Sequence, residues 1–359
     1  MFSWLRHRSG GRTLAGLLLV AAFVFGLAAS PASADSDKRI VKVMTYNMDA
    51  GTDFVYFIAN PTDPALAYSL TLSELMNSGF ADRAGLLADT IAAEEPYLVS
   101  LQEVTVWDYI TNDGSRISLL ADQLELLTAA LEERGLHYTV VTVQPLTNVM
   151  LPLADNYNFH FLDRNVILAR TDLSQAELAL SNVRQAEFAA TFEPLQGFLQ
   201  VNGWMSVDAK IRGKSVRVFG THLASPLYPG DPVQGMQGAE LIEILNASPL
   251  PVVVAGDFNS DMSGLELGPD LTTTGADIVA AGYADAWTAM HQPWEGLTWP
   301  LFWEDIFAGV YPNGQPVERI DLIFQKGMEV LGAEVVGTSA PYPSDHAGVV
   351  ATLLIEKKK

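Results

Sequence analysis

The chain has 359 residues, of which 49% are hydrophobic and 18% charged, and it contains no cysteine. This composition supports a substantial buried core and excludes a disordered protein, and the lack of cysteine excludes disulfides, a thiolate nucleophile and cysteine-ligated metals. With 21 Lys and Arg against 42 Asp and Glu, the formal net charge is −21. Such acidity argues against binding nucleic acid or anionic membranes by bulk charge. It does not exclude an enzyme that holds phosphate with metal ions and a few placed residues.

The N-terminus predicts a secretory signal peptide over residues 1–34. A positively charged stretch up to Arg12 precedes an apolar run from Leu14 to Ala29, and Ala32-Ser33-Ala34 has the small-residue form that a signal peptidase accepts. An uncleaved membrane anchor is the alternative, although the apolar run is shorter than the roughly 20 residues of a spanning helix. We therefore expect a secreted protein, bacterial extracellular or periplasmic.

The rest of the chain alternates β-rich runs with amphipathic stretches, without a repeat or a compositional break. Apolar patterns predict strands, in chain order, at 40–46, 98–103, 138–143, 165–169, 204–211, 216–222, 252–257, 320–324 and 349–355. Apolar residues at three-to-four spacing predict helices at 81–94, 117–134 and 233–245. We expect one α/β domain over residues 39–356, with two sheets because the strands are too many for one compact sheet.

Polar side chains gather where predicted strands end or begin: Asn47, Glu103, His222, Asp257, Asn259, Asp321, Asp345 and His346. Polar groups at strand ends converge on one edge of a sheet sandwich, where loops build sites. Carboxylates and amides are hard oxygen ligands that suit Mg²⁺, Mn²⁺ or Ca²⁺, and imidazoles beside such a metal supply the proton transfer of phosphoester cleavage. Each residue alone has an ordinary structural role as a cap, a turn residue or a buried histidine. Their combination and order predict a metal-dependent site.

Short sequences carrying a more specific signal run in order through nearly the whole chain after residue 39: Met44-Thr45-Tyr46-Asn47, Leu101-Gln102-Glu103, Thr221-His222-Leu223, Gly256-Asp257-Phe258-Asn259, Glu318-Arg319-Ile320-Asp321 and Ser344-Asp345-His346. Together they resemble the motif series of the endonuclease/exonuclease/phosphatase superfamily. That group includes DNase I-like nucleases, abasic-site endonucleases, neutral sphingomyelinases and inositol polyphosphate 5-phosphatases. The resemblance implies a four-layer α/β sandwich, with two mixed β-sheets face to face and helices outside, and a Mg²⁺-dependent phosphoesterase.

The resemblance also implies the metal ligands. Glu103 corresponds to the principal ligand, and Asn47 lies beside it and holds metal or phosphate. Asp345 lies next to the metal. Asp257 is a further candidate ligand that positions or deprotonates the attacking water. Mg²⁺ is the implied cofactor, with Mn²⁺ or Ca²⁺ as alternatives.

The proton-transfer and phosphate-binding groups follow in the same way. Asn259 is expected to hold the scissile phosphate, and His222 to contact it or protonate the leaving oxygen. His346 is expected to act as an acid, a base or a phosphate-stabilising group, oriented by Asp321. One metal and two imidazoles would neutralise the charge that develops in an in-line phosphoryl transition state. Which group is the general base stays open.

One strand departs from the family pattern. Many relatives have Gly-Asn-x-Ile-Leu-Ser where this chain has Arg164-Asn165-Val166-Ile167-Leu168-Ala169. Asn165 remains a candidate phosphate ligand. Arg164 replaces a small residue, and it is either a phosphate contact or the partner of a neighbouring acid such as Asp163. The mid-chain Tyr and Asn of abasic-site endonucleases have no match, which weakens that subgroup.

An aromatic-rich segment over residues 287–311 contains Trp287, Trp294, Trp299 and Trp303 and no Lys or Arg. Such a segment suits an apolar ligand, base stacking or transient contact with a membrane surface, and packing on the sheet edge is the structural alternative. The expected partner is a phosphoester substrate: a lipid, a small organic phosphate or nucleic acid. No obligate protein partner is evident from the sequence.

Three functions are therefore considered. The favoured one is a secreted Mg²⁺-dependent phosphoesterase that hydrolyses a phosphodiester or phosphomonoester of a lipid or small organic alcohol by metal-assisted in-line attack of water. The first alternative is an extracellular DNase I-like nuclease, for which secretion and the same site argue. The second alternative is a binding module that has kept the fold and lost turnover. The two alternatives differ in their response to changes at Glu103 and His346, which would leave only a binding module unaffected.

Overall fold

The computed structural model describes residues 39–52, 54–60, 62–154, 157–195, 197–226, 231–305, 309–311 and 315–355. The predicted signal peptide lies outside these residues. Residues 39–359 form one unit by their internal contacts. In the part of the chain that the structure describes, no helix has the length and apolarity needed to cross a membrane.

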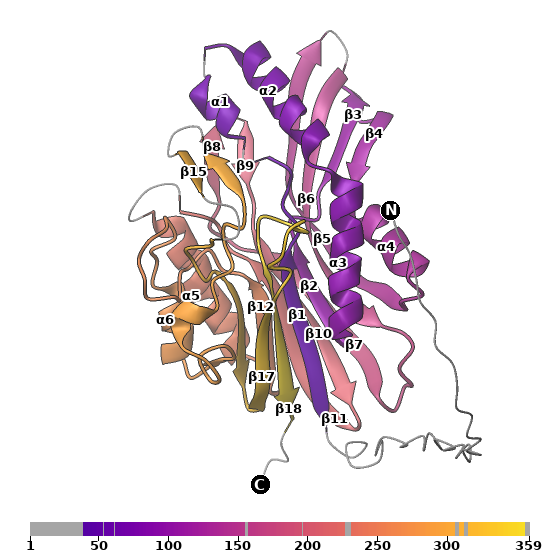
Figure 1. The fold of residues 1–359 in the computed structure, drawn as a ribbon, viewed down its shortest axis with the longest axis vertical. Helices are drawn as coiled ribbons and strands as arrows, with labels where there is room; N and C mark the ends of the chain where they lie inside the picture. Colours follow the sequence, from indigo (N-terminus) through magenta and orange to yellow (C-terminus); the bar gives the residue numbers. More distant parts are fainter. Residues whose placement is uncertain are drawn as a thin grey trace, which may run out of the picture. The chain divides into compact units, whose positions relative to one another are not determined.

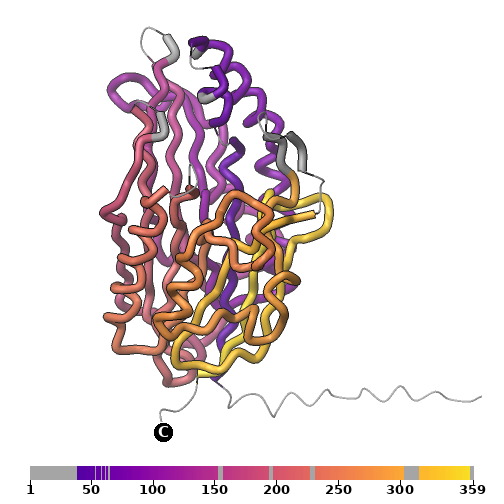
Figure 2. The backbone as a smooth tube through the Cα atoms, turned by 90° about the vertical axis from the view of Figure 1, so that its left-hand side faces the viewer, coloured from indigo at the N-terminus to yellow at the C-terminus, as the bar shows by residue number. Residues whose placement is uncertain are grey.

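The first sheet has the strand order β17-β18-β1-β2-β6-β3-β4, with β5 pairing with β6 in addition. Its strands are β1 (Ile40–Asn47), β2 (Leu98–Gln102), β3 (Val106–Thr111), β4 (Arg116–Asp122), β5 (Tyr138–Ala154), β6 (Tyr157–Arg170), β17 (Glu329–Val336) and β18 (Gly348–Leu354). The neighbours β1 and β2 are parallel, whereas β1 and β18 are antiparallel, so the sheet is mixed. Strands β1 and β18 come from opposite ends of the described chain and run side by side (Figure 1; Figure 2).

The second sheet has the order β13-β16-β12-β11-β10-β7. Its strands are β7 (Leu178–Glu187), β10 (Gly203–Ile211), β11 (Lys214–His222), β12 (Val252–Asp257), β13 (Ala284–Asp285) and β16 (Asp321–Lys326). It is also mixed, because β11 and β12 are parallel while β12 and β16 are antiparallel. Two small antiparallel pairs lie outside the main sheets: β8 (Phe192–Leu195) with β9 (Phe198–Gln200), and β14 (Trp303–Asp305) with β15 (Gly309–Tyr311).

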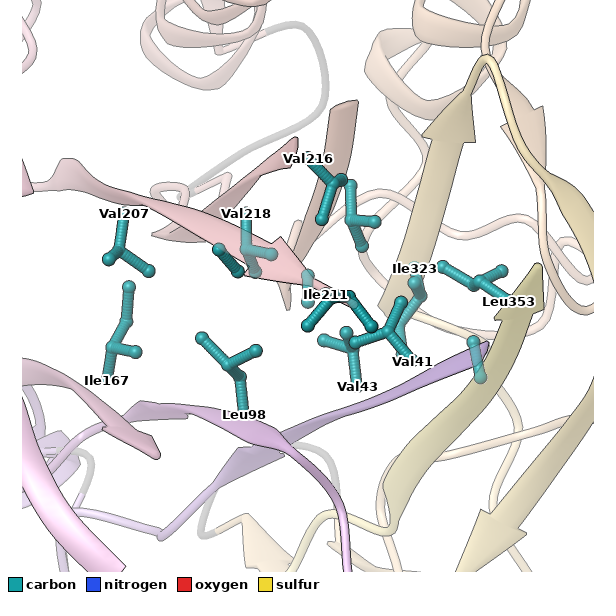
Figure 3. Close-up of a cluster of buried hydrophobic side chains, with 14 of the residues drawn as sticks. Val41, Val43, Leu98, Ile167, Val207, Ile211, Val216, Val218, Ile323 and Leu353 are labelled. Atoms are coloured by element: carbon teal, nitrogen blue, oxygen red, sulfur yellow. The ribbon is translucent and has the colours of Figure 1, made fainter. Parts of the chain in front are cut away.

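The two sheets pack face to face on a shared apolar core. Val41, Val43, Leu98 and Ile167 of the first sheet belong to the same buried cluster as the inward side chains of the second. Figure 3 shows Val218, like its neighbours on the second sheet, facing the first sheet across the core. Alternate side chains of a strand point to opposite faces, so each strand supplies this core with every second residue.

Helices cover the outer faces of the sheets. On the first sheet, α3 (Phe80–Glu94) and α4 (Gln123–Glu133) bury leucines against β2 and β6, while α5 (Pro232–Asn246) and α6 (Thr274–Ala280) cover the second. The remaining helices are α1 (Val55–Ala59), α2 (Pro64–Asn77) and a short 3₁₀ turn (Pro293–Glu295). The resulting order of helix, sheet, sheet and helix is the four-layer architecture that the motif resemblance implied (Figure 1).

One predicted helix is wrong over its first turn and a half. The helix expected at 117–134 begins only at Gln123, because residues up to Asp122 form strand β4 and pair with β3. Asp122 caps the helix by accepting hydrogen bonds from the backbone N–H groups of Leu124 and Glu125. The side chains of Arg116 to Leu120 are exposed, so their apolar members do not form the buried helical face that their spacing favoured.

Strand β5 is much longer than the predicted 138–143. It runs to Ala154 through Pro145 and Pro152, and its pairing with β6 shifts register beside both prolines. Proline has no backbone N–H to donate within a sheet, so it occurs in strands mainly at such irregularities. The two prolines are the reason that the sequence pattern did not predict a strand beyond residue 143.

Gly220 marks a close approach of the two sheets. A Cβ atom there would lie 2.6 Å from the Ser100 Oγ and 3.2 Å from the Met205 Cε. We expect Gly220→Ala to lower the free energy of unfolding by about 1–3 kcal/mol, because overpacking forces neighbours from their places. Gly332 in β17 is a matched control, since its nearest atom lies at 4.0 Å, and Gly332→Ala should be neutral or slightly stabilising. Urea unfolding of both variants measures this difference, and equal midpoints would contradict it.

Candidate active site

The strand ends place acids, amides and imidazoles at one edge of the sandwich. Pairing of β11, β12 and β16 puts His222, Asp257 and Asp321 directly beside one another in the second sheet. In the first sheet, parallel pairing of β1 and β2 places Asn47 opposite Gln102, with Glu103 following. The register of five strands thereby assembles most of the predicted site.

Asn47 joins the two sheets at this edge. Its Nδ2 donates to the Glu103 Oε1 at 2.8 Å and to the Asp257 Oδ2 at 3.0 Å, while its Oδ1 accepts from the Asp49 N–H at 2.9 Å. Asn47 is fully buried. One amide therefore fixes the separation of a carboxylate from each sheet.

Glu103 sits in a left-handed turn, with φ 53°, directly after β2. Its Oε2 accepts a hydrogen bond from the Ala50 N–H at 2.6 Å. Burial raises the pKa of the Glu103 carboxyl to about 8, although the nearby His346 and the amide of Asn47 oppose this rise. A carboxyl in such surroundings is most stable when a cation takes the place of its proton.

The donor set around Glu103 fits a divalent ion. Among the described residues, Glu103, His222 and Asp257 offer ligand atoms that all lie within 4.8 Å of one another, and so do Asp257, Asp321 and His346. The oxygens of Glu103 and Asp257 are the hard donors that Mg²⁺, Mn²⁺ and Ca²⁺ prefer. The sequence-predicted ligands Asn47, Glu103 and Asp257 are thus brought together as one candidate metal site.

His346 forms a buried pair with Asp321. Its Nδ1 lies 2.8 Å from the Asp321 Oδ2, and its Nε2 lies 3.9 Å from the Asp257 Oδ2. Burial lowers the pKa of His346, but the charges of Asp321 and Asp345 outweigh it and hold that pKa well above the ordinary value. The Asp321 partner leaves Nε2 as the nitrogen that faces the cluster.

Asn259 and His222 form a second contact in the site. The Nδ2 of Asn259 donates to the Leu223 carbonyl at 2.8 Å and lies 3.3 Å from the His222 Nε2. The backbone N–H of Asn259 donates to the Asp257 Oδ1 at 2.9 Å. His222 also lies 3.6 Å from the Asp257 Oδ2, and its buried Nδ1 has no hydrogen-bond partner.

Asp345 is half-buried beside the cluster. Its Oδ2 accepts from the Trp299 indole N–H at 3.1 Å, and its Oδ1 accepts from the Ser344 hydroxyl at 3.1 Å. Burial, and after it the charge of Asp49, raise the pKa of Asp345 to about 7. The Trp299 ring also packs against His346, with 6.2 Å between the ring centroids.

In segment 164–169, which departs from the family pattern, Asn165 and Arg164 have different surroundings. Asn165 is fully buried, and neither its Oδ1 nor its Nδ2 has a hydrogen-bond partner, which leaves the whole amide available to a ligand. The Arg164 guanidinium instead donates to both Asp122 oxygens and to the Val104 carbonyl. Its ion pair is therefore made with Asp122 rather than Asp163, and its role as a phosphate contact stays a prediction.

Asp163 is a site residue that the motif analysis missed. It is buried, its Oδ1 has no partner, and its charge interacts with His222 and Glu103. Burial raises the pKa of Asp163, and the nearby His222 opposes this. A signal was present in the sequence, because residues two apart on a strand share a face and Asp163 precedes Asn165 by two positions.

The aromatic segment 287–311 is divided among three environments. Trp287 is buried, stacks on His291 and donates to the Gln292 carbonyl, whereas Trp294 is 52% exposed. Trp299 belongs to the site through Asp345. Residues 306–308 lie outside the described part of the chain. The packing alternative therefore holds for Trp287.

Arg83 supports the site from α3, behind the metal-binding edge. Its guanidinium donates to the Asp49 carboxylate and to the carbonyls of Met48 and Asp49. The same loop supplies the N–H groups that bind Asn47 and Glu103. Arg83 thus fixes the backbone that orients two candidate ligands.

We expect Arg83→Ala to weaken metal binding about 10–100-fold, the usual cost of losing a group that orients ligands. The measurement is activity as a function of metal concentration, with Arg83→Lys and added guanidinium as rescues. Arg134→Ala is the control, because Arg134 pairs with Asp89 at the surface. An unchanged metal requirement in Arg83→Ala would contradict this role.

Metal binding should depend on pH through Glu103. Its carboxyl, with a pKa of about 8 in the metal-free protein, must lose its proton before it binds a metal ion. Below pH 8 the apparent affinity for Mg²⁺ or Mn²⁺ should therefore fall, by up to about tenfold per pH unit. Calorimetric titration between pH 6 and 9 in buffers of different ionisation enthalpy would also count the protons released. Affinity independent of pH over this range would contradict the prediction.

The model of the endonuclease/exonuclease/phosphatase family matches residues 44–346, and the chain belongs to this family. Family members are metal-dependent phosphoesterases, and the described residues contain a candidate metal site of the corresponding kind. A search of the curated proteins found no match.

Solved structures show the same fold. A family protein from Leptotrichia buccalis is 16% identical, with a TM-score of 0.55 and 87% of this chain and 99% of that chain covered. A family protein from Beutenbergia cavernae is 22% identical, with a TM-score of 0.53 and coverages of 89% and 72%. A mannosyl-6-phosphatase from Bacteroides thetaiotaomicron is 17% identical, with a TM-score of 0.51 and coverages of 87% and 99%. At these identities the likeness concerns the fold.

Proposed function

We propose that the protein is a secreted, Mg²⁺-dependent phosphoesterase that hydrolyses a phosphodiester or phosphomonoester of a lipid or small organic alcohol. The observation that carries the proposal is the Asn47 amide, which holds Glu103 and Asp257 together beside two buried imidazoles. Acids, amides and histidines in this arrangement would bind a divalent ion, hold the phosphate and transfer protons, which are the roles that in-line attack of water on phosphorus requires.

Glu103 and Asp257 would hold the metal, with Asn47 beside them and Asp345 at the margin of the site. A divalent ion bound there would polarise a phosphate oxygen and neutralise charge that develops in the transition state. The side-chain amides of Asn165 and Asn259 would bind the phosphate oxygens. The Asn165 amide is the better placed for this role, because it has no partner within the protein.

Proton transfer would fall to Asp257 and the two histidines. Asp257 would orient the attacking water or take its proton. His346, kept protonated by Asp321, would donate from Nε2 to the phosphate or to the leaving oxygen. The His222 Nε2 lies 4.0 Å from the Glu103 Oε1, and His222 would contact the phosphate from the Glu103 side of the site.

The test is hydrolysis of p-nitrophenyl phosphate and bis-p-nitrophenyl phosphate by the purified protein. Activity should require Mg²⁺ or Mn²⁺, disappear with EDTA and return when metal is added back. If these esters, sphingomyelin and DNA all stay intact with either metal, the chain is a binding module. Plasmid nicking that exceeds the turnover of lipids and small esters would instead make it a nuclease.

Two further parts of the proposal have their own tests. Export through residues 1–34 predicts that the mature protein begins after Ala34, which N-terminal sequencing of protein from the culture medium or periplasm would check. Contact with a membrane surface through segment 287–311 rests on the exposed Trp294. Trp294→Ala should then reduce co-sedimentation with phosphatidylcholine vesicles, with no change if the segment is scaffold.

A further inference from the structure

Two buried glutamines bind the turns that carry a candidate metal ligand and a candidate phosphate ligand, and the proposed function assigns them no role. Gln123 is the first residue of α4, and Gln234 is the third residue of α5. These helices cover the outer faces of opposite sheets (Figure 1). Gln123 is 2% exposed and Gln234 is fully buried, and the Nε2 of each donates to backbone carbonyl groups of the site.

Gln234 binds both peptide groups that flank Asn259. Its Nε2 donates to the Phe258 carbonyl at 2.8 Å and to the Asn259 carbonyl at 2.9 Å. Rotation of these two peptide groups sets the backbone angles of Asn259, whose φ is 43°. The Thr274 hydroxyl donates to the Gln234 Oε1 at 2.6 Å, which fixes the orientation of the amide. Asn259 is thereby held in the left-handed region, with its side-chain Nδ2 beside the His222 Nε2.

Gln123 binds the turn of Glu103 in a similar way. Its Nε2 donates to the Glu103 carbonyl at 3.3 Å and to the Thr105 hydroxyl oxygen at 2.9 Å, and its backbone N–H donates to the Thr105 carbonyl at 3.0 Å. The same Nε2 donates to the Asp49 carbonyl at 2.9 Å, in the loop whose Ala50 N–H binds the Glu103 carboxylate. One side chain therefore joins the backbone of Glu103 to the loop that orients its carboxylate.

Both turns depend on such support, because Glu103 and Asn259 have positive φ angles. A residue other than glycine rarely adopts this conformation, since its Cβ crowds the backbone, and the conformation persists where the surroundings hold it. Once the carbonyl groups lose their donors, the turns would relax toward ordinary φ angles. The side chains of Glu103 and Asn259 would then leave their places in the site.

We propose that Gln123 and Gln234 are positioning residues, the first for metal binding through Glu103 and the second for phosphate binding through Asn259. The inference rests on the proposed phosphoesterase function, which gives Glu103 and Asn259 these roles. Because the two turns belong to different sheets, loss of each glutamine should weaken the binding of a different ligand.

Gln123→Met keeps the length of the side chain and removes its hydrogen bonds. We expect it to weaken Mn²⁺ binding about 10–100-fold, the usual cost of losing a group that orients a metal ligand. Calorimetric titration of the purified protein with MnCl₂, without substrate, measures this affinity. At a Mg²⁺ concentration that saturates the variant, its affinity for inorganic phosphate should equal that of the unmodified protein.

Gln234→Met should show the opposite pattern. Its affinity for inorganic phosphate, measured by phosphorus NMR titration in saturating Mg²⁺, should fall about tenfold, because a hydrogen bond to an anion is lost or misaligned. Its affinity for Mn²⁺ should be unchanged. In turnover, Gln234→Met should raise KM for bis-p-nitrophenyl phosphate, whereas Gln123→Met should raise the metal concentration that gives half the maximal rate.

Gln325→Met is the matched control. Gln325 is 6% exposed, and its Oε1 accepts the Met328 N–H at 3.0 Å at the end of β16 that lies away from Asp321. Gln325→Met should lose stability as the other two variants do and keep both affinities. If a methionine variant fails to fold, Gln123→Glu or Gln234→Glu takes its place, since each keeps the shape of the side chain and exchanges the N–H donors for an oxygen.

Unchanged affinities in the Gln123 and Gln234 variants, or an equal loss of both affinities in both variants, would overturn the inference. Binding needs no turnover, so this failure can be distinguished from failure of the proposed function. If no ester is hydrolysed with any metal while the two affinities separate as expected, only the proposed function fails. If esters are hydrolysed and the affinities do not separate, only the inference fails.

Discussion

Glu103→Gln is expected to lower metal-dependent hydrolysis about 10³-fold, because it removes the negative charge that binds the metal and leaves a side chain of the same shape. The neutral amide still accepts the hydrogen bond from the Ala50 N–H, so the loop and the fold should be retained. Loss of activity would then reflect the metal site rather than unfolding. Rate against metal concentration, together with circular dichroism, separates the two.

The matched control is Glu133→Gln, which removes the same charge from an exposed position on α4. That variant should keep the activity of the unmodified protein. Equal activity of Glu103→Gln and Glu133→Gln in saturating metal would show that the chemistry takes place elsewhere. It would also contradict the assignment of Glu103 as the principal metal ligand.

His346→Ala should cost about 10²–10⁴-fold in kcat, the range for loss of a positioned acid or base. Asp321→Asn keeps the imidazole but removes the charge that holds its pKa up. A lower pKa of His346 means that its protonated form is lost at lower pH. The high-pH limb of the activity profile should therefore move to lower pH in Asp321→Asn.

Two measurements check this pair of variants. The pH profile of kcat/KM reports the shift in activity, and NMR titration of the His346 ring protons in metal-free protein reports the pKa itself. His137→Ala, at an exposed position, is the control. A profile that is identical in Asp321→Asn and the unmodified protein would contradict the proposed role of Asp321.

Much of the site could be predicted from local sequence patterns, because its residues lie at the ends of strands and those patterns predict where strands end. The apolar run at 252–255 became most of β12, which ends at Asp257, and the acids and amides at such strand ends came together as the motif order implied. The pairing itself did not follow from the sequence: the parallel strands β11 and β12 bring their carboxyl ends to one edge, whereas β16 runs antiparallel to β12 and contributes Asp321 from its first residue.

What escaped prediction depends on partners distant in sequence. The pairing of Arg164 with Asp122 joins β6 to the start of α4, and that of Arg83 with Asp49 joins α3 to the loop after β1. No periodic pattern encodes such contacts, because they depend on how whole elements pack. The exposed apolar residues of β4 led to a helix being predicted where there is a strand, because Ile117 and Leu119 fit a helical pattern although they are not buried.

The bridge that Asn47 makes between the sheets has a thermodynamic consequence. Each half of the sandwich contributes one carboxylate to the pair, so neither half alone holds a complete metal site. A bound ion would act as a cross-link between the halves, and its binding energy would add to the energy that keeps them docked. Metal concentration would then determine the resistance of the protein to heat and denaturant as well as its rate of hydrolysis. Chelation would weaken the contact between the two sheets at the edge on which catalysis depends.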